Sequence, residues 1–165
     1  MQKSTILLCP AKEKTKIMRT KIIFRYVGLT LVMVATLMLA SALVAFLMHD
    51  RESLIPLLYS AFITFIVGGY PLIFTRHGKH VSKAEGYHVV VFSWLAACIF
   101  GMLPYLCFGK EFTPVNSLFE SVSGFTTTGA SILDDIEAVP AGLLFWRMAT
   151  CFFWIGFVLA VTSTM

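Results

Sequence analysis

The sequence predicts an all-α membrane protein with four transmembrane helices and one short re-entrant helix, and three observations lead to this fold class. Of the 165 residues, 58% are hydrophobic and only 13% are charged, and the mean hydropathy is +0.81. Uncharged stretches of spanning length recur along the chain. A moderately apolar segment lies between the last two of these stretches. A bilayer therefore suits this chain better than water does.

Three stretches without Lys, Arg, Asp or Glu are each long enough to cross a hydrocarbon core of about 30 Å, namely Tyr26–Met48, Ser53–Thr75 and Gly86–Phe108. The uncharged run Met148–Met165 reaches this length only together with the residues just before it, so we expect the fourth span over 143–165. The division that follows is a basic N-terminal segment, a helix pair with its connecting loop, and a second unit, at 1–25, 26–85 and 86–165.

Basic residues gather in two short segments beside the expected spans. Seven Lys and Arg precede the first span against Glu13 alone, and the connection 76–85 holds three against Glu85. The connections 49–52 and 109–142 are acidic on balance. Because basic connections stay on the cytoplasmic side, we expect a multi-pass protein of the cell (inner or plasma) membrane with both termini cytoplasmic. This topology accounts for the net charge of +4 without a nucleic-acid partner.

The other candidate residues indicate packing rather than chemistry. The cysteines lack the spacing of metal ligands or disulfide frameworks, and the histidines are scattered near span ends; these residues are Cys9, Cys98, Cys107, Cys151, His49, His77, His80 and His88. Gly68, Gly69 and Pro71 in the second span favour a packing contact or a kink over a gate. The sequence has no motif of a nucleophile with its base, no phosphate loop and no paired-carboxylate site, so we do not expect an enzyme.

The segment between the third and fourth spans predicts a helix too short to cross a membrane. Thr113 is a good N-cap, Pro114 suits the first helical position, and Gly124 is a plausible stop. The expected helix, 114–123, is about 15 Å long, half the thickness of a bilayer core. Such a helix can enter the membrane but cannot cross it, so the chain after it must return to the side from which the helix entered.

The residues after this helix predict an extended return, Thr126–Ala130, that spans about 16 Å. Irregular backbone at membrane depth is tolerated where it is buried in protein or lines a watery cavity, so the hairpin of short helix and extended loop indicates a pore. Carbonyl oxygens and threonine hydroxyls replace water around a cation, and the C-terminal end of the short helix is partially negative. Asp134, Asp135 and Glu137 follow the loop and would raise the cation concentration at the outer mouth.

This segment resembles the first pore loop and selectivity filter of Trk-type potassium uptake proteins, the Trk/Ktr family. The resemblance rests on Asn116–Ser131, with the sequence NSLFESVSGFTTTGAS. It extends over most of the chain through four further short matches, at Arg25–Gly28, Ser82–Tyr87, Gly101–Tyr105 and Leu144–Arg147. The fold implied is a re-entrant pore helix and an extended filter loop between two spans, one helix–pore-loop–helix repeat preceded by a helix pair.

The resemblance implies the substrate, the site and the partners. It places Thr127, Thr128, Gly129 and Ala130 on the filter beside Thr126, with Gly129 as the filter glycine and potassium held at Thr127, Thr128 and Gly129. Potassium is the transported substrate, and no cofactor is implied. The expected partners are the lipid bilayer, a cytosolic nucleotide-binding regulatory subunit, and the remaining pore repeats or further copies of the chain.

Two charged residues and one glycine are expected to support the filter. Glu120 lies within the short helix, where a lone carboxylate is expensive; we expect it to hold the loop by accepting hydrogen bonds, and ion coordination is the alternative. Arg147 either anchors the last helix at the outer interface or pairs with Glu120 or with the two aspartates after the loop. Gly124 completes this supporting set.

Two departures from the family keep other functions open. The chain holds one filter strand, whereas the family has four, and its last span keeps only Gly156 of a usually glycine-rich stretch. Potassium uptake is therefore the first hypothesis. The alternatives are a non-conducting membrane fragment or interaction partner, and a homotetrameric cation channel. The coupling ion, the true start (Met1 or Met18) and the length of the complete gene product stay open.

Overall fold

The computed structural model describes residues 20–74, 83–109, 112–132 and 139–163. Within these ranges the chain forms helices and no strand, so the predicted all-α class is confirmed there. The helices are α1 (Thr20–Leu47), α2 (Arg51–Phe74), α3 (Lys83–Gly101), α4 (Leu103–Phe108), α5 (Pro114–Phe125) and α6 (Ala141–Ser163).

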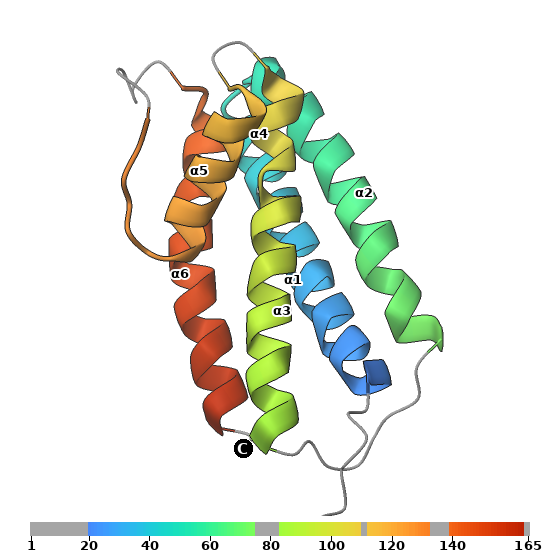
Figure 1. Cartoon of the computed structure of the whole chain (residues 1–165). Coiled ribbons are helices and arrows are strands. Elements are labelled where there is room, and N and C mark those ends of the chain that lie inside the picture. Colours follow the sequence, from blue (N-terminus) through green and yellow to red (C-terminus); the bar gives the residue numbers. More distant parts are fainter. Residues whose placement is uncertain (1–19, 75–82, 110–111, 133–138, 164–165) are drawn as a thin grey trace, which may run out of the picture.

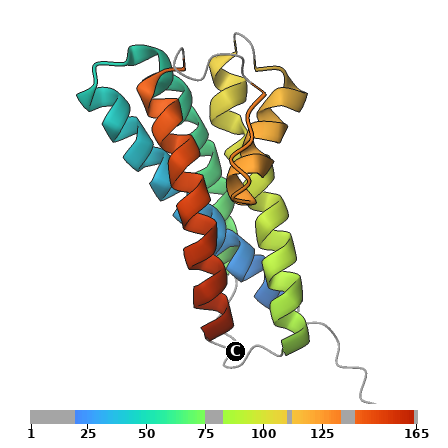
Figure 2. The same cartoon turned by 90° about the vertical axis from the view of Figure 1, so that its left-hand side faces the viewer.

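Four long rods, α1, α2, α3 and α6, run along the bundle with alternating directions, while α4 and α5 lie at one end of it (Figures 1 and 2). Three described segments are long and apolar enough to cross a membrane: Lys21–Leu47, Arg51–Phe74 and Gly86–Phe108. In α6 the apolar run Ala141–Gly156 is shorter. Large apolar side chains such as Ile73 and Phe152 are exposed around the bundle, as expected where lipid covers it. The chain is therefore a membrane protein.

The long helices begin earlier than the uncharged stretches suggested. The first begins at Thr20, the third at Lys83 and the last at Ala141, whereas the spans were expected from Tyr26, Gly86 and 143. A helix needs only its own backbone hydrogen bonds, so it continues through charged residues beyond the apolar core.

The predicted span 86–108 is present as one apolar segment, but the prediction of a single helix there is wrong, because Met102 separates α3 from α4. Pro104, near the start of α4, has no N–H, and a proline ring clashes with the carbonyl four residues earlier in a continuous helix. The Gly101 carbonyl at the break accepts a hydrogen bond from Trp146 Nε1 of α6 at 3.3 Å. The break thus ties α3 to the last helix.

Helices α1 and α2 meet at two glycines. A Cβ added to Gly28 would lie 2.7 Å from the Gly68 carbonyl oxygen and 3.1 Å from the Cβ of Pro71. A side chain at either glycine would force the helices apart, as in other small-residue contacts between membrane helices. The predicted packing role is confirmed for Gly68 and Pro71, while a Cβ on Gly69 would have no neighbour within 4 Å.

The corner between α1 and α2 also holds the start of α6. Asp50 Oδ2 accepts hydrogen bonds from Ser53 Oγ at 2.6 Å and from the Gly142 backbone N–H at 3.4 Å. A Cβ on Gly142 would collide with Ser53 Oγ and lie 2.7 Å from the Cβ of Ala45. The helix pair α1–α2 therefore packs directly against the start of α6 in the second unit.

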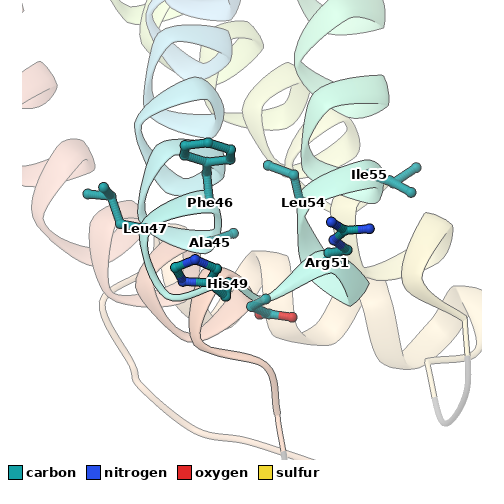
Figure 3. Close-up of a pocket in the computed structure, with 8 residues that line it drawn as sticks. Ala45, Phe46, Leu47, His49, Arg51, Leu54 and Ile55 are labelled. Atoms are coloured by element: carbon teal, nitrogen blue, oxygen red, sulfur yellow. The ribbon is translucent and has the colours of Figure 1, made fainter.

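A pocket of about 460 Å³ opens at the same corner, between the end of α1 and the start of α2 (Figure 3). Five of its eight lining residues are apolar, and Figure 3 shows Arg51 beside it at the start of α2; the lining residues are Ala45, Phe46, Leu47, His49, Asp50, Arg51, Leu54 and Ile55. None of them belongs to the loop after α5, so this pocket is separate from the predicted site.

Candidate functional site

Helix α5 begins as its sequence predicts. Thr113 is the N-cap, its side chain accepts a hydrogen bond from the Asn116 N–H at 3.3 Å, and Pro114 occupies the first turn. These local signals suffice because an N-cap oxygen and a proline both suit the unpaired N–H groups of a first turn.

The predicted end of this helix is wrong by two residues, since α5 continues through Phe125 and Gly124 does not stop it. Gly124 instead permits contact between helices, because a Cβ at this position would collide with Thr150 Oγ1 of α6. The helix ends at Thr126, whose N–H binds the Val122 carbonyl at 2.9 Å.

Helix α5 and the loop after it form a hairpin beside α6. Figure 1 shows α5 starting at the end of the bundle near α4 and running inward, after which the loop returns toward the same end. Figure 2 shows the loop on one face of the bundle. Residues Thr126–Ala130 are all exposed on this face. The hairpin therefore presents the predicted filter residues together.

The first residues of the loop form a turn rather than the predicted extended return. The N–H of Thr127 binds the Gly124 carbonyl at 3.0 Å, and that of Thr128 binds the Ser123 carbonyl at 3.1 Å. Thr127 has φ of 58° and Gly129 has φ of 71°. The free carbonyls at a helix end capture the next N–H groups, so the chain winds before it extends.

Threonine hydroxyls gather at the end of α5. Thr126 Oγ1 donates to the Val122 carbonyl at 2.8 Å and shares a hydrogen bond of 2.9 Å with Thr128 Oγ1. Thr127 Oγ1 donates to the Thr126 carbonyl at 2.6 Å. Hydroxyl and carbonyl oxygens thus collect at the partially negative end of a helix dipole, an environment that suits a cation.

Glu120 holds the far end of the loop. The residue is 1% exposed, and its Oε1 accepts hydrogen bonds from Ser131 Oγ at 2.6 Å and from the Ile132 N–H at 2.8 Å. The hydrogen bonds predicted for this carboxylate are therefore present. They bring residues after the filter segment back against the middle of α5.

Arg147 of α6 joins the same cluster. Its Nη1 lies 3.2 Å from Glu120 Oε2, and its Nη2 donates to the carbonyls of Gly129 at 2.9 Å and Ala130 at 3.0 Å. Of the pairings considered for Arg147, the one with Glu120 is present. The alternative partners Asp134 and Asp135, and Glu137 at the expected outer mouth, lie outside the described residues.

Two serines complete the cluster, and the sequence interpretation missed both. Ser123 Oγ donates to the Ala130 carbonyl at 2.6 Å, and Ser131 Oγ donates to Glu120. One signal was available for Ser123: the expected short helix carries three serines, Ser117, Ser121 and Ser123, in an otherwise apolar chain. Buried polar side chains usually bond to protein groups, as Ser121 and Ser123 do, although Ser117 Oγ has no hydrogen-bond partner among the described residues.

The fold and this cluster define an α-helical membrane protein in which two long helices hold a short helix and an oxygen-rich loop between them. The chain belongs to the TrkH family of cation transport proteins, whose family model matches residues 56–165.

Potassium uptake proteins are among its relatives. Over 132 residues the chain is 33% identical to the Trk system potassium uptake protein TrkH of Vibrio parahaemolyticus, a match that covers 79% of the chain and 27% of that protein. TrkH of Halomonas elongata is 30% identical with the same coverage. TrkG of Escherichia coli is 29% identical over 71% of the chain and 24% of that protein. The chain thus spans about a quarter of the length of these relatives.

Proposed function

We propose that this chain contributes one side of the potassium path in a potassium uptake system. The observation that carries the proposal is the loop Thr126–Ala130, which sits at the end of α5 in a chain of the TrkH family. The matched relatives are named for potassium uptake. Backbone carbonyls and threonine hydroxyls are the groups that replace the water around a potassium ion.

In this proposal α6 is the fourth transmembrane helix and α5 is a re-entrant pore helix. The alternation of helix directions supports this arrangement, because the start of α1 and the end of α6 lie at the same end of the bundle (Figure 1). Both chain ends then face the cytoplasm of a cell in whose inner or plasma membrane the protein resides. Basic residues before α1 and in the connection 76–85 favour this orientation.

In this proposal the remaining sides of the path come from further repeats of the same polypeptide; completion by further copies of the chain is the alternative, a homotetrameric channel. The exposure of the whole loop Thr126–Ala130 supports such completion, since irregular backbone at membrane depth needs protein or water around it. A cytosolic nucleotide-binding regulatory subunit, as the family resemblance suggests, would dock on the cytoplasmic side.

Rubidium uptake tests the proposal. The complete coding sequence is expressed in bacteria that lack their own potassium uptake systems, and uptake is measured with and without competing sodium. We expect the product to restore uptake and growth at low potassium. Absence of uptake in cells whose membranes contain the product would overturn the proposal.

An experiment on residues 1–165 alone distinguishes the proposed function from that of a homotetrameric channel. Purified chain is reconstituted in liposomes, and potassium flux and cross-linked species are recorded. We expect no flux, because one loop does not enclose a path. Flux that accompanies a four-chain cross-linked species would favour the channel instead.

A further inference from the structure

We infer that Glu120 and Arg147 determine which carbonyl oxygens of the loop face the potassium path. They hold back the carbonyls of Gly129 and Ala130 and leave those of Thr127 and Thr128 as the ion ligands of this strand. The inference rests on the proposed function and narrows the set of ligands within it.

The first step concerns the carbonyls that already have partners. Arg147 Nη2 donates to the Gly129 carbonyl at 2.9 Å and to the Ala130 carbonyl at 3.0 Å, and Ser123 Oγ also donates to Ala130 at 2.6 Å. Hydrogen bonds from a guanidinium are among the strong ones. An oxygen bound to a cationic donor is a poor ligand for a potassium ion, since one of its two lone pairs is used and the positive charge of the donor lies beside it.

The second step concerns the carbonyls that stay free. Within the described ranges, the carbonyls of Thr127 and Thr128 accept no hydrogen bond. The N–H groups of these two peptides belong to Thr128 and Gly129, and both donate to the Ser123 carbonyl at the end of α5, at 3.1 Å and 3.5 Å. The positive φ of Thr127, 58°, is a conformation that persists for a β-branched residue only where its surroundings impose it. The helix end therefore fixes these two peptides with their oxygens available.

The third step concerns charge. The guanidinium reaches the loop from α6 and donates to two of its carbonyls, so by itself it would repel a cation bound at the loop. Glu120 Oε2 lies 3.2 Å from Arg147 Nη1, and the side chains are 0% and 12% exposed, respectively. The pair therefore positions two peptides without adding net charge beside the path.

The fourth step separates charge from hydrogen bonding. In Glu120→Gln the amide oxygen still accepts from Ser131 and Ile132, while the charge opposite Arg147 is lost. We expect the rubidium concentration for half-maximal uptake by the complete gene product to rise roughly tenfold, the factor that a modest repulsion near an ion site produces. The matched control is Glu52→Gln, the same change at an exposed residue in the first turn of α2, which should leave uptake as in the parent.

The double variant Glu120→Gln with Arg147→Met removes both charges and releases the Gly129 carbonyl, while the Ala130 carbonyl keeps its hydrogen bond from Ser123 Oγ. We expect the half-maximal concentration to return to near that of the parent, while discrimination against sodium falls roughly tenfold because one more oxygen reaches the ion. A purely structural role of the pair predicts parental discrimination in every variant that reaches the membrane. The variants are compared at equal amounts in the membrane.

If the double variant does not reach the membrane, Arg147→Lys provides the test instead. A lysine retains the ion pair but lacks the planar fork that serves two carbonyls and a carboxylate together, so we expect parental half-maximal concentration with weaker discrimination. Parental discrimination in Arg147→Lys, or parental affinity in Glu120→Gln, would overturn the inference while the proposed function stands. Absence of rubidium uptake by the parent would instead contradict the proposed function itself.

Discussion

At the scale of the residue, Gly129 is needed for its conformation rather than for space. Its φ is 71°, and a Cβ at this position would have no neighbour within 4 Å. Residues with a side chain rarely adopt this region, and β-branched ones do so at a cost of about 1–3 kcal/mol. Any effect of a side chain here therefore reports backbone strain and not a collision.

Gly129→Val should reduce potassium transport or its discrimination against sodium, because the valine drives the backbone out of the left-handed region. Gly129→Ser should have a smaller effect, since a short unbranched side chain tolerates this region better. Rubidium uptake by the complete gene product, with and without sodium, measures both.

The control for this prediction is Gly69→Val, which introduces the same side chain into α2 at a position with open space and no positive φ. Its uptake should match that of the parent. If Gly129→Val also transports and discriminates like the parent, the loop does not line the path.

At the scale of the element, α5 and α6 approach closely at one small residue. Gly124 faces Thr150, whose Oγ1 donates to the Arg147 carbonyl at 2.8 Å. The same short stretch of α6 thus provides the helix contact and the guanidinium of the cluster. Separation of the two helices would draw Arg147 away from the loop.

Gly124→Ala should lower the free energy of unfolding by about 1–3 kcal/mol, because the added methyl overfills a packed contact. Thr150→Ala removes the oxygen that the methyl meets, so the double variant should regain most of the loss. Thermal melting of the purified protein in detergent measures this. The control is Gly156→Ala, at an open position of α6. Equal melting temperatures of Gly124→Ala and Gly156→Ala would contradict a close contact between Gly124 and Thr150.

The corner at Asp50 is the second link between elements. Asp50 Oδ1 also accepts from the Ser53 N–H in the first turn of α2 at 3.3 Å. Asp50→Ala removes this cap and the acceptor for Gly142, and we expect a loss of about 1 kcal/mol of stability. Asp50→Asn keeps an acceptor oxygen and should lose less. The same melting experiment ranks the variants, and a stability of Asp50→Ala equal to that of the parent would show that the corner does not support α6.

At the scale of the whole molecule, the bundle places the helix pair and the second unit against each other with a consistent alternation of direction (Figures 1 and 2). This alternation, together with the basic connections, predicts which end faces the cytoplasm. Helix α5 lies toward the end of the bundle opposite the start of α1 and the end of α6 (Figure 1), so we expect the cluster around Glu120 in the outer half of the membrane.

Single cysteines test this orientation in a background whose four natural cysteines are replaced. His49→Cys, in the connection between α1 and α2, should react with a membrane-impermeant maleimide added to intact cells. Ser82→Cys, in the connection 76–85, should react only after the cells are opened. The reverse pattern would invert the orientation and move the cluster to the cytoplasmic side.

Local chemistry explains what the sequence alone could predict about this protein. Uncharged stretches predict helices that lipid can surround, Thr113 and Pro114 predict the start of α5, and the motif around Gly129 indicates the family. Each signal acts within a few residues along the chain: hydrophobicity, an unpaired N–H group, a glycine conformation. For the same reason the sequence placed helix ends less well, because helices continue beyond the apolar residues that reveal them.

Only the tertiary structure decided what residues distant in sequence do to one another. Pro104 can be read in the sequence, but the apolar run around it gave no sign of the break at Met102. Beside this break the Gly101 carbonyl accepts a hydrogen bond from Trp146 of α6. Gly124 resembled a helix stop until Thr150 was placed beside it. Arg147 had several possible partners by charge alone, and the packing of α6 on α5 selected Glu120 and two carbonyls. Ion pairs and helix contacts depend on where helices cross, which is a property of the packed bundle and not of any single segment.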